Sequence, residues 1–255
     1  MNGYNYSVFL SEAKISIDNW IKKNQHLFFL NEKSMLEYEI MKIFSAVNDS
    51  QRNEALEIIY NSYFKSFKNK SKTSLYNFIN NKTQTDYEQL ELLVVYGLFN
   101  DLKPESNKIV SLLRRGIINY LINTPTELPV LGNRYFDYAV THTIFWGSLY
   151  NQNNYYLYKA FSLKQIKCLL KKCLSVSLIN NDIDVLIEVL ACINICCKKS
   201  DLIYNSNLFE YALSFVEKNF SESLGHIIFS KENDNFGTCY HPTLALRIMI
   251  STYIK

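Results

Sequence analysis

Two carboxylates and two histidines lie in the most apolar parts of this sequence, and these residue types can move protons or bind a metal ion. Asp184 and Glu188 fall in the segment 183–197, where nearly every other residue is apolar. His142 and His241 each lie in a similar apolar stretch. Charged side chains in such surroundings must be paired, hydrogen-bonded or bound to a cation. We therefore take these four residues as the candidate functional site.

The segment that carries the two carboxylates predicts a buried helix. Its apolar residues occur on all sides rather than along one stripe, which is typical of a helix without a solvent-exposed face. Four positions separate Asp184 from Glu188, so both side chains lie on the same face. A structural partner, such as Arg114, Arg134 or a tyrosine hydroxyl, would explain the pair as well as a catalytic role would.

His241 directly precedes Pro242 near the end of the sequence. A residue before proline is disfavoured in the α conformation, and proline is tolerated in the first turn of a helix. We therefore expect a last helix within 238–250, with Pro242 at its first position and His241 at its mouth. The positive end of the helix dipole disfavours imidazolium there. A neutral imidazole suits a general base or a metal ligand, and a histidine that only caps its own helix is an equal alternative.

His142 lies between two threonines, Thr141 and Thr143, in an apolar helical segment. A buried histidine of this kind is more often a satisfied core residue than a ligand. A functional interpretation is favoured because both histidines and both carboxylates fall in apolar helices that look central to the fold. If His142 and His241 meet the two carboxylates, they form a polar cluster in an apolar cavity, which is the usual anatomy of a site.

A divalent metal ion is one candidate cofactor, and its ligands would be His142, Asp184, Glu188 and His241. Zinc could take two histidines and a carboxylate, although these residues are far apart in the sequence. A ferritin-like di-iron site is disfavoured, because it requires a glutamate three residues before a histidine. The spacing Asn180, Asp184, Glu188 is similar to the magnesium motif of class I terpene synthases. This sequence departs from that family, which has a hydroxyl residue where Asp184 lies and a partner aspartate-rich motif that we do not find here.

Glycine and proline are scarce, with 7 Gly and 4 Pro in 255 residues. A β-rich chain of this length needs more turn residues, and helical spacing of apolar residues recurs throughout. We therefore predict an all-α fold of antiparallel helical hairpins, arranged as an α/α toroid or, alternatively, as an open helical array. We expect a single domain over residues 1–255, with a possible boundary between two halves at 124–133. No glycine-rich motif of dinucleotide, P-loop or nucleophile-elbow sites occurs.

Charge and hydropathy exclude two classes of partner. The formal net charge of +3 is too small to indicate nucleic acid binding. No apolar run reaches the roughly 20 residues that a membrane span requires. The sequence shows no signal-peptide pattern, and its six cysteines form no paired CxxC framework. We therefore expect a cytoplasmic protein with reduced core thiols.

Three segments carry a resemblance to a known family. They are Tyr138-Ala-Val-Thr-His-Thr-Ile-Phe-Trp-Gly147, Asp182-Ile-Asp-Val-Leu-Ile-Glu-Val-Leu-Ala-Cys192 and Cys239-Tyr-His-Pro-Thr-Leu-Ala245. In order and separation they resemble an uncharacterised bacterial family, domain of unknown function 6895. The family motif carries over onto Thr141, His142, Asp184, Glu188 and His241. The sequence departs from the family after Phe145 and before the last helix.

Members of that family often occur in natural-product gene clusters. The resemblance therefore implies a tailoring or accessory enzyme in bacterial natural-product biosynthesis, with a small molecule or a peptide as substrate. It implies no particular reaction. The alternative is a non-catalytic helical scaffold that binds a biosynthetic partner protein. An enzyme needs the four side chains around an open cavity, whereas a scaffold would have them sealed and mutually paired.

Overall fold

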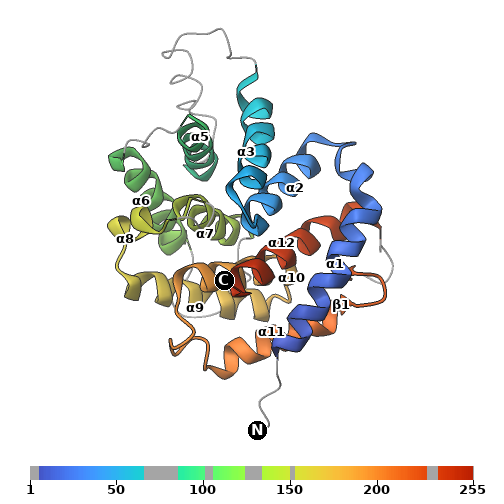
Figure 1. Ribbon diagram of the computed structural model, residues 1–255. Coiled ribbons are helices and arrows are strands. Elements are labelled where there is room, and N and C mark those ends of the chain that lie inside the picture. The colour runs from blue at the N-terminus through green and yellow to red at the C-terminus, as the bar shows by residue number, and fades with distance from the viewer. Residues whose placement is uncertain are drawn as a thin grey trace. The chain divides into compact units, whose positions relative to one another are not determined.

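The computed structural model describes residues 6–65, 86–100, 106–123, 134–149, 153–228 and 235–254, and these are almost entirely helical (Figure 1). The helices are α1 (Tyr6–Phe28), α2 (Glu32–Ser45), α3 (Asp49–Phe64), α5 (Asp86–Phe99), α6 (Ser106–Asn123), α7 (Arg134–Gly147), α8 (Tyr155–Ala160), α9 (Leu163–Ile179), α10 (Ile183–Cys196), α11 (Asn207–Asn219) and α12 (Phe236–Ile254). The strands described are β1 (Phe220–Ser221) and β2 (His226–Ile227), which pair antiparallel. The predicted all-α fold is confirmed.

The chain divides into two compact units. Unit 1 contains Met1–Met41 and Leu169–Lys255, and unit 2 contains Lys42–Cys168. The boundary predicted at 124–133 lies outside the described residues. A single domain and an α/α toroid both stay predictions.

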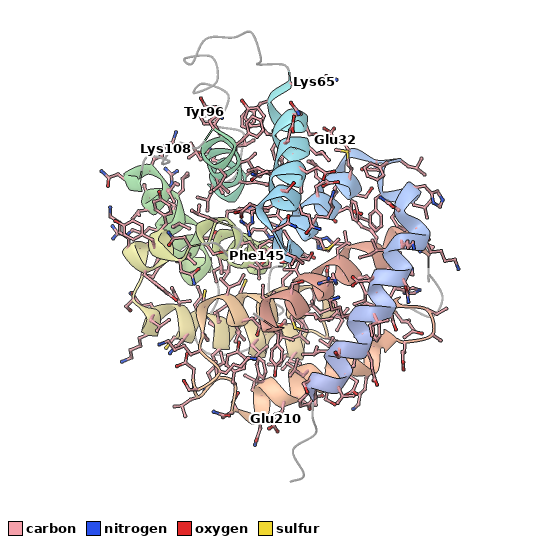
Figure 2. All side chains as sticks on the ribbon, in the orientation of Figure 1. Glu32, Lys65, Tyr96, Lys108, Phe145 and Glu210 are labelled. Atoms are coloured by element: carbon pink, nitrogen blue, oxygen red, sulfur yellow. The ribbon has the colours of Figure 1, made fainter. Side chains whose placement is uncertain are left out.

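Helix α10 forms the core of unit 1 and packs mainly against α12. Every residue of α10 except Asn194 is buried, including the two carboxylates. The expectation of a helix buried on all sides is therefore confirmed. Side chains fill the space between the helices (Figure 2), so α10 has no polar face to place in water, and its charged groups must find partners in the protein.

The start of α10 is set by its own sequence. Asp182 is the N-cap, and its side chain accepts a hydrogen bond of 3.3 Å from the backbone N–H of Val185. Such caps satisfy one of the orphan N–H groups of a helix. Asn180 lies in the turn before the cap. The spacing of Asn180, Asp184 and Glu188 therefore does not place all three on one helix, unlike the magnesium motif that it resembles in sequence.

Helix α12 begins earlier than the proline rule predicts. It starts at Phe236, and Pro242 lies inside it. The reason is tertiary packing: the ring of Phe236 stacks on Trp20 at 5.9 Å and meets Phe28 edge-on at 4.9 Å between ring centroids. The expectation that His241 lies at the mouth of the helix is therefore wrong. His241 is the sixth residue of α12, past the turn in which the helix dipole acts most strongly.

Helix α1 is fixed to α12 by an ion pair and by the β-hairpin. The guanidinium of Arg247 donates a 2.6 Å hydrogen bond to Asp18. The hairpin is tied to α12 where the backbone N–H of Ile227 donates to the hydroxyl of Thr243 at 3.0 Å. At its tip, Gly225 has a φ of +76°, and a Cβ there would lie 2.5 Å from the carbonyl oxygen of Ser16. Only glycine fits this close approach without strain.

Unit 2 is built around α6 and α7, which pack closely. A Cβ on Gly147 would lie 2.7 Å from side-chain carbons of both Leu113 and Leu157. The glycine that ends α7 therefore lets α6 and α8 approach its backbone. The segment after Phe145 therefore has a packing role at the end of α7.

The described residues contain no helix that is both long and apolar enough to cross a membrane. All six cysteines are free thiols. Five of them are buried as predicted, whereas Cys168 is exposed, so the expectation of a core thiol is wrong at that position.

We predict that Gly225→Ala lowers the free energy of unfolding by about 2–4 kcal/mol, because the methyl group adds a clash with Ser16 to an unfavourable backbone conformation. Urea unfolding followed by circular dichroism measures it. Gly237→Ala is the matched control. Its Cβ would meet only the side chain of Asn235 at 3.2 Å, so stability should change little. Equal stabilities of the two variants would contradict the prediction.

Candidate functional site

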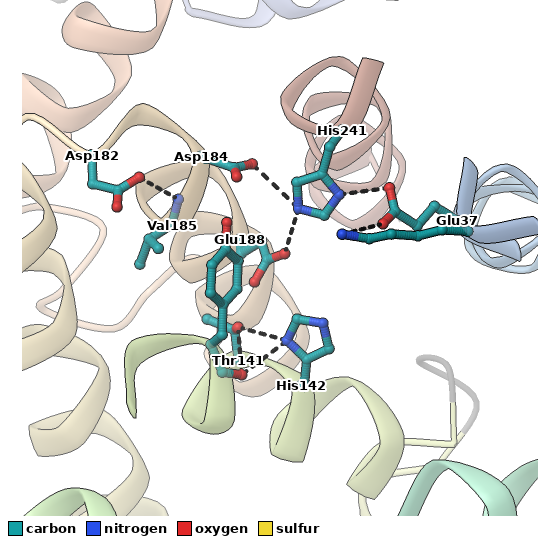
Figure 3. Close-up of polar contacts among 10 residues, drawn as sticks. Glu37, Thr141, His142, Asp182, Asp184, Val185, Glu188 and His241 are labelled. Carbon is teal, nitrogen blue, oxygen red and sulfur yellow. Dashed lines mark hydrogen bonds and ion pairs between the residues drawn. The ribbon is translucent and has the colours of Figure 1, made fainter. Parts of the chain in front are cut away.

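His241 is the centre of a charged cluster within unit 1 (Figure 3). Its Nδ1 lies 2.8 Å from Oε2 of Glu37. Its Nε2 lies 3.4 Å from Oδ1 of Asp184 and 3.4 Å from Oε1 of Glu188. One imidazole ring therefore faces three carboxylates from two other helices. A further cation, Lys33, places its Nζ 3.8 Å from Oε1 of Glu37.

Three helices position these groups. Asp184 lies in the first turn of α10, where the helix dipole favours a negative charge. Glu188 follows one turn later on the same face, so both carboxylates point at the neighbouring α12, which carries His241. Glu37 comes from α2, on the opposite side of the imidazole ring in Figure 3.

The four side chains differ in their exposure. The side chains of Asp184 and Glu188 are 6% and 4% exposed, that of Glu37 is 17% exposed, and that of His241 is 28% exposed. The carboxylates of α10 thus form the floor of the cluster, and the imidazole is its most accessible member. A molecule that approaches the cluster from solvent would reach the ring before it reaches the floor.

The carboxylates determine the protonation of His241. Burial alone lowers the pKa of an imidazole. The charge of Asp184, the hydrogen bonds to Glu188 and Glu37 and the charge of Glu37 outweigh burial, so the pKa of His241 is raised well above 6.5. The ring is therefore an imidazolium ion at neutral pH. The expectation of a neutral imidazole is wrong, because it considered the dipole of α12 and not the carboxylates of two other helices.

The geometry does not match the metal site that the sequence suggested. Over the described part of the chain, no group of three or more His, Cys, Asp or Glu side chains could hold a metal ion. Nδ1 of His241 faces Glu37, and Nε2 faces Asp184 and Glu188. The residues present therefore fit an ion-pair cluster better than a zinc site.

Thr141 and His142 belong to unit 2, where they contact their own helix. Nδ1 of His142 lies 2.9 Å from the carbonyl oxygen of Tyr138, and the hydroxyl of Thr141 donates to the same oxygen at 3.1 Å. The imidazole also makes edge-on contacts with the rings of Tyr138, Phe145 and Trp146. Within α7 these contacts agree with the alternative of a satisfied core histidine.

The structure brings together three of the predicted site residues, Asp184, Glu188 and His241. Of the expected structural partners, Arg114 donates to the carbonyl of Ala160 in unit 2 at 3.4 Å, and the side chain of Arg134 lies outside the described residues. Within unit 1, His241 is a partner of both carboxylates.

Sequence reasoning missed two acidic residues of α2. Glu37 completes the cluster, and Glu39 is fully buried. The segment Glu32–Glu39 contains three glutamates, which is typical of a solvated helix face. The spacing in the sequence could have identified Glu37, because it precedes the buried Met41 by one turn and therefore lies on the same face of the helix.

No protein-family model matches the sequence, and searches of curated proteins and of solved structures return no match.

We predict that Glu37→Gln lowers the pKa of His241, because it removes the carboxylate charge next to Nδ1. NMR titration of histidine-labelled protein measures this pKa, with His241→Gln to assign the signal. Asp182→Asn is the matched control: it removes the charge of the carboxylate that caps α10 at Val185 and keeps an oxygen for that cap. The same titration curve in Glu37→Gln and wild type would refute the interaction.

We also predict that His241→Gln destabilises the protein by about 2–4 kcal/mol near pH 6, because it leaves buried carboxylates without their cation. The raised pKa fixes the sign of the pH dependence. The stabilisation from His241 is complete below its unfolded pKa of 6.5 and disappears as pH rises through the folded pKa. Urea unfolding of both proteins between pH 6 and 10 should therefore give a shrinking difference. A difference that grows with pH would contradict this assignment.

Proposed function

We propose that this protein is a tailoring enzyme in bacterial natural-product biosynthesis, in which His241 exchanges a proton with the substrate. The observation that carries the proposal is the unequal bonding of the two ring nitrogens. Nδ1 makes one short contact of 2.8 Å with Glu37, whereas Nε2 shares two contacts of 3.4 Å between Asp184 and Glu188.

The short contact suits an orienting role. A carboxylate bonded to Nδ1 fixes the ring and leaves the proton on Nε2 for exchange, which is how carboxylates assist histidines in acid–base sites. Glu37 is placed to do this for His241.

The long contacts suit a reacting position. N–H···O bonds in proteins cluster near 2.9–3.0 Å, so contacts of 3.4 Å are weak. A substrate atom could replace either one at little cost. The imidazole is the most exposed member of the cluster, with 28% of its side chain exposed, so it is the group that a substrate would meet first.

The raised pKa sets the direction of proton transfer. His241 enters the reaction as an imidazolium ion and acts first as an acid, and the neutral ring that remains can take the proton back. Asp184 and Glu188 would accept hydrogen bonds from hydroxyl or amine groups beside the protonated atom. Positioned acid–base groups contribute typically about 10²–10⁴-fold to a rate. Such a site suits elimination, isomerisation or ring closure.

The place of this chemistry in natural-product biosynthesis is supported by the resemblance of the segments 138–147, 182–192 and 239–245 to a bacterial family from natural-product gene clusters. The substrate would be a small molecule or a peptide. Thr141 and His142 are part of the same family motif and stay candidate site residues in this proposal.

A scaffold that binds a biosynthetic partner protein is the second candidate function. The observation that favours it is that the charged groups of the cluster are mutually paired. In that case His241 would hold α2, α10 and α12 together and would exchange no proton with a ligand.

Gene replacement in the host tests the proposal. We predict that deletion of the gene removes a secondary metabolite, and that His241→Gln fails to restore it although the variant is folded and expressed at the wild-type level. A precursor of that metabolite should accumulate in both strains. Mass spectrometry of culture extracts measures both compounds. The control Asp182→Asn should restore production, because it leaves the cluster intact.

The other outcomes separate the two functions. If deletion abolishes the metabolite but folded His241→Gln restores it fully, the protein acts as a scaffold. If deletion leaves the set of metabolites unchanged, the biosynthetic role is wrong for both candidates.

A further inference from the structure

The carboxylate of Glu37 bridges two cations, one at each of its oxygens. Oε2 lies 2.8 Å from Nδ1 of His241, as Figure 3 shows, and Oε1 lies 3.8 Å from Nζ of Lys33. The side chain of Lys33 is 78% exposed, whereas that of Glu37 is 17% exposed. Lys33 thus reaches from solvent to a largely buried carboxylate, and this carboxylate connects it to the imidazole.

A second carboxylate of unit 1 forms the same kind of bridge. On α1, Oδ2 of Asp18 lies 2.9 Å from Nζ of Lys14, and Oδ1 accepts a 2.6 Å hydrogen bond from Arg247. In both bridges the lysine comes one turn before the acid, and the other cation belongs to α12. An arginine is permanently charged, whereas a histidine gains and loses a proton. The bridge of α1 can therefore only hold its helix in place, whereas the bridge of α2 can also act on a proton.

Helix stability does not account for Lys33. It is the second residue of α2, in the turn where the helix dipole disfavours a positive charge. A lysine four residues before a glutamate is also the less favourable order for such a pair, and exposed pairs of this kind are weak. The start of α2 has other anchors, since the hydroxyl of Ser34 donates to the carbonyl of Phe28 at 2.9 Å and the ring of Tyr38 stacks on that of Phe28 at 4.9 Å. Lys33 is therefore suited to fix the carboxylate of Glu37 rather than the helix.

The direction of this carboxylate matters for the imidazole. The terminal torsion of a glutamate side chain has a broad minimum, so the carboxylate can rotate without strain unless its oxygens have partners. We propose that Lys33 is a positioning residue for His241, which holds the carboxylate of Glu37 in the rotation that places Oε2 against Nδ1. Its consequence for catalysis rests on the proposed function, whereas its effect on the imidazole can be measured without a substrate.

The alternative is that Lys33 acts on His241 only as a nearby positive charge. The two ideas predict opposite effects on the exchange of the Nδ1 proton with water. If Lys33 positions Glu37, its loss weakens the bond to Nδ1 and speeds the exchange. If it acts only through its charge, its loss slows the exchange, because a cation attracts the hydroxide ions that remove the proton.

Lys33→Gln distinguishes the two, because it removes the charge and keeps a polar side chain. We expect the Nδ1 proton of His241 to exchange about twofold to threefold faster, which is the effect of one weak, exposed ion pair. Lys33→Arg keeps the charge and should restore the wild-type rate. NMR of histidine-labelled protein measures the exchange. An unchanged or slower rate in Lys33→Gln overturns the proposal, and so does a failure of Lys33→Arg to restore the rate.

Lys14→Gln is the matched control, because it breaks the equivalent bridge on α1 and leaves Glu37 in place. It should leave the exchange rate unchanged, and an acceleration equal to that of Lys33→Gln would overturn the proposal. Urea unfolding of Lys33→Gln tests for a merely structural role, and we expect the free energy of unfolding of the wild type. A loss of stability that matches the faster exchange would mean that the proton exchanges through unfolding, which would also overturn the proposal.

The experiments also separate this inference from the proposed function. If Lys33→Gln speeds the exchange but folded His241→Gln still restores the metabolite, positioning holds and the enzymatic role fails. If His241→Gln abolishes the metabolite but Lys33→Gln leaves the exchange unchanged, the enzymatic role holds and positioning fails.

Discussion

The attraction between the imidazolium of His241 and the carboxylates of α10 is the constraint on which unit 1 depends. Asp184 and Glu188 lie in a helix that is buried on nearly every side, where carboxylates without partners would cost several kcal/mol each, on the order of the whole stability of a domain. In the structure these two carboxylates face a cation of α12, the imidazolium of His241. This requirement is met where α12 lies against α10 and brings His241 to Asp184 and Glu188.

The cluster of Glu37, Asp184, Glu188 and His241 is both a set of buried ion pairs and a candidate proton-transfer site. Ion pairs in protein interiors give little net stability compared with apolar residues of the same size. Packing alone therefore does not require four ionisable groups at the contact of α2, α10 and α12. A proton-transfer site does require ionisable groups in contact, because it needs an accessible group whose protonation state is set by its neighbours. This reasoning supports the enzymatic proposal over the scaffold.

Local pattern predicted much of this protein, and distant contacts account for what it missed. The scarcity of glycine and proline indicated an all-α fold, and the apolar residues around α10 indicated its burial. The start of α12 was missed, because the packing of Phe236 on Trp20 outweighs the preference of Pro242. Glu37 was missed because it lies among surface-like glutamates and its partner, His241, is 204 residues away. No local rule can identify a residue whose environment is supplied by the far end of the fold.

The separation of Glu37 and His241 in the sequence also determines when unit 1 can fold during synthesis. Unit 1 is assembled from segments on either side of unit 2 in the sequence. A ribosome that adds about 5–20 residues per second needs roughly 10–40 seconds to proceed from Glu37 to His241. During this interval α12 is missing, so the surface of α1 that packs against α12 has no native partner. The nascent chain would therefore be a client for chaperones until its last helix emerges.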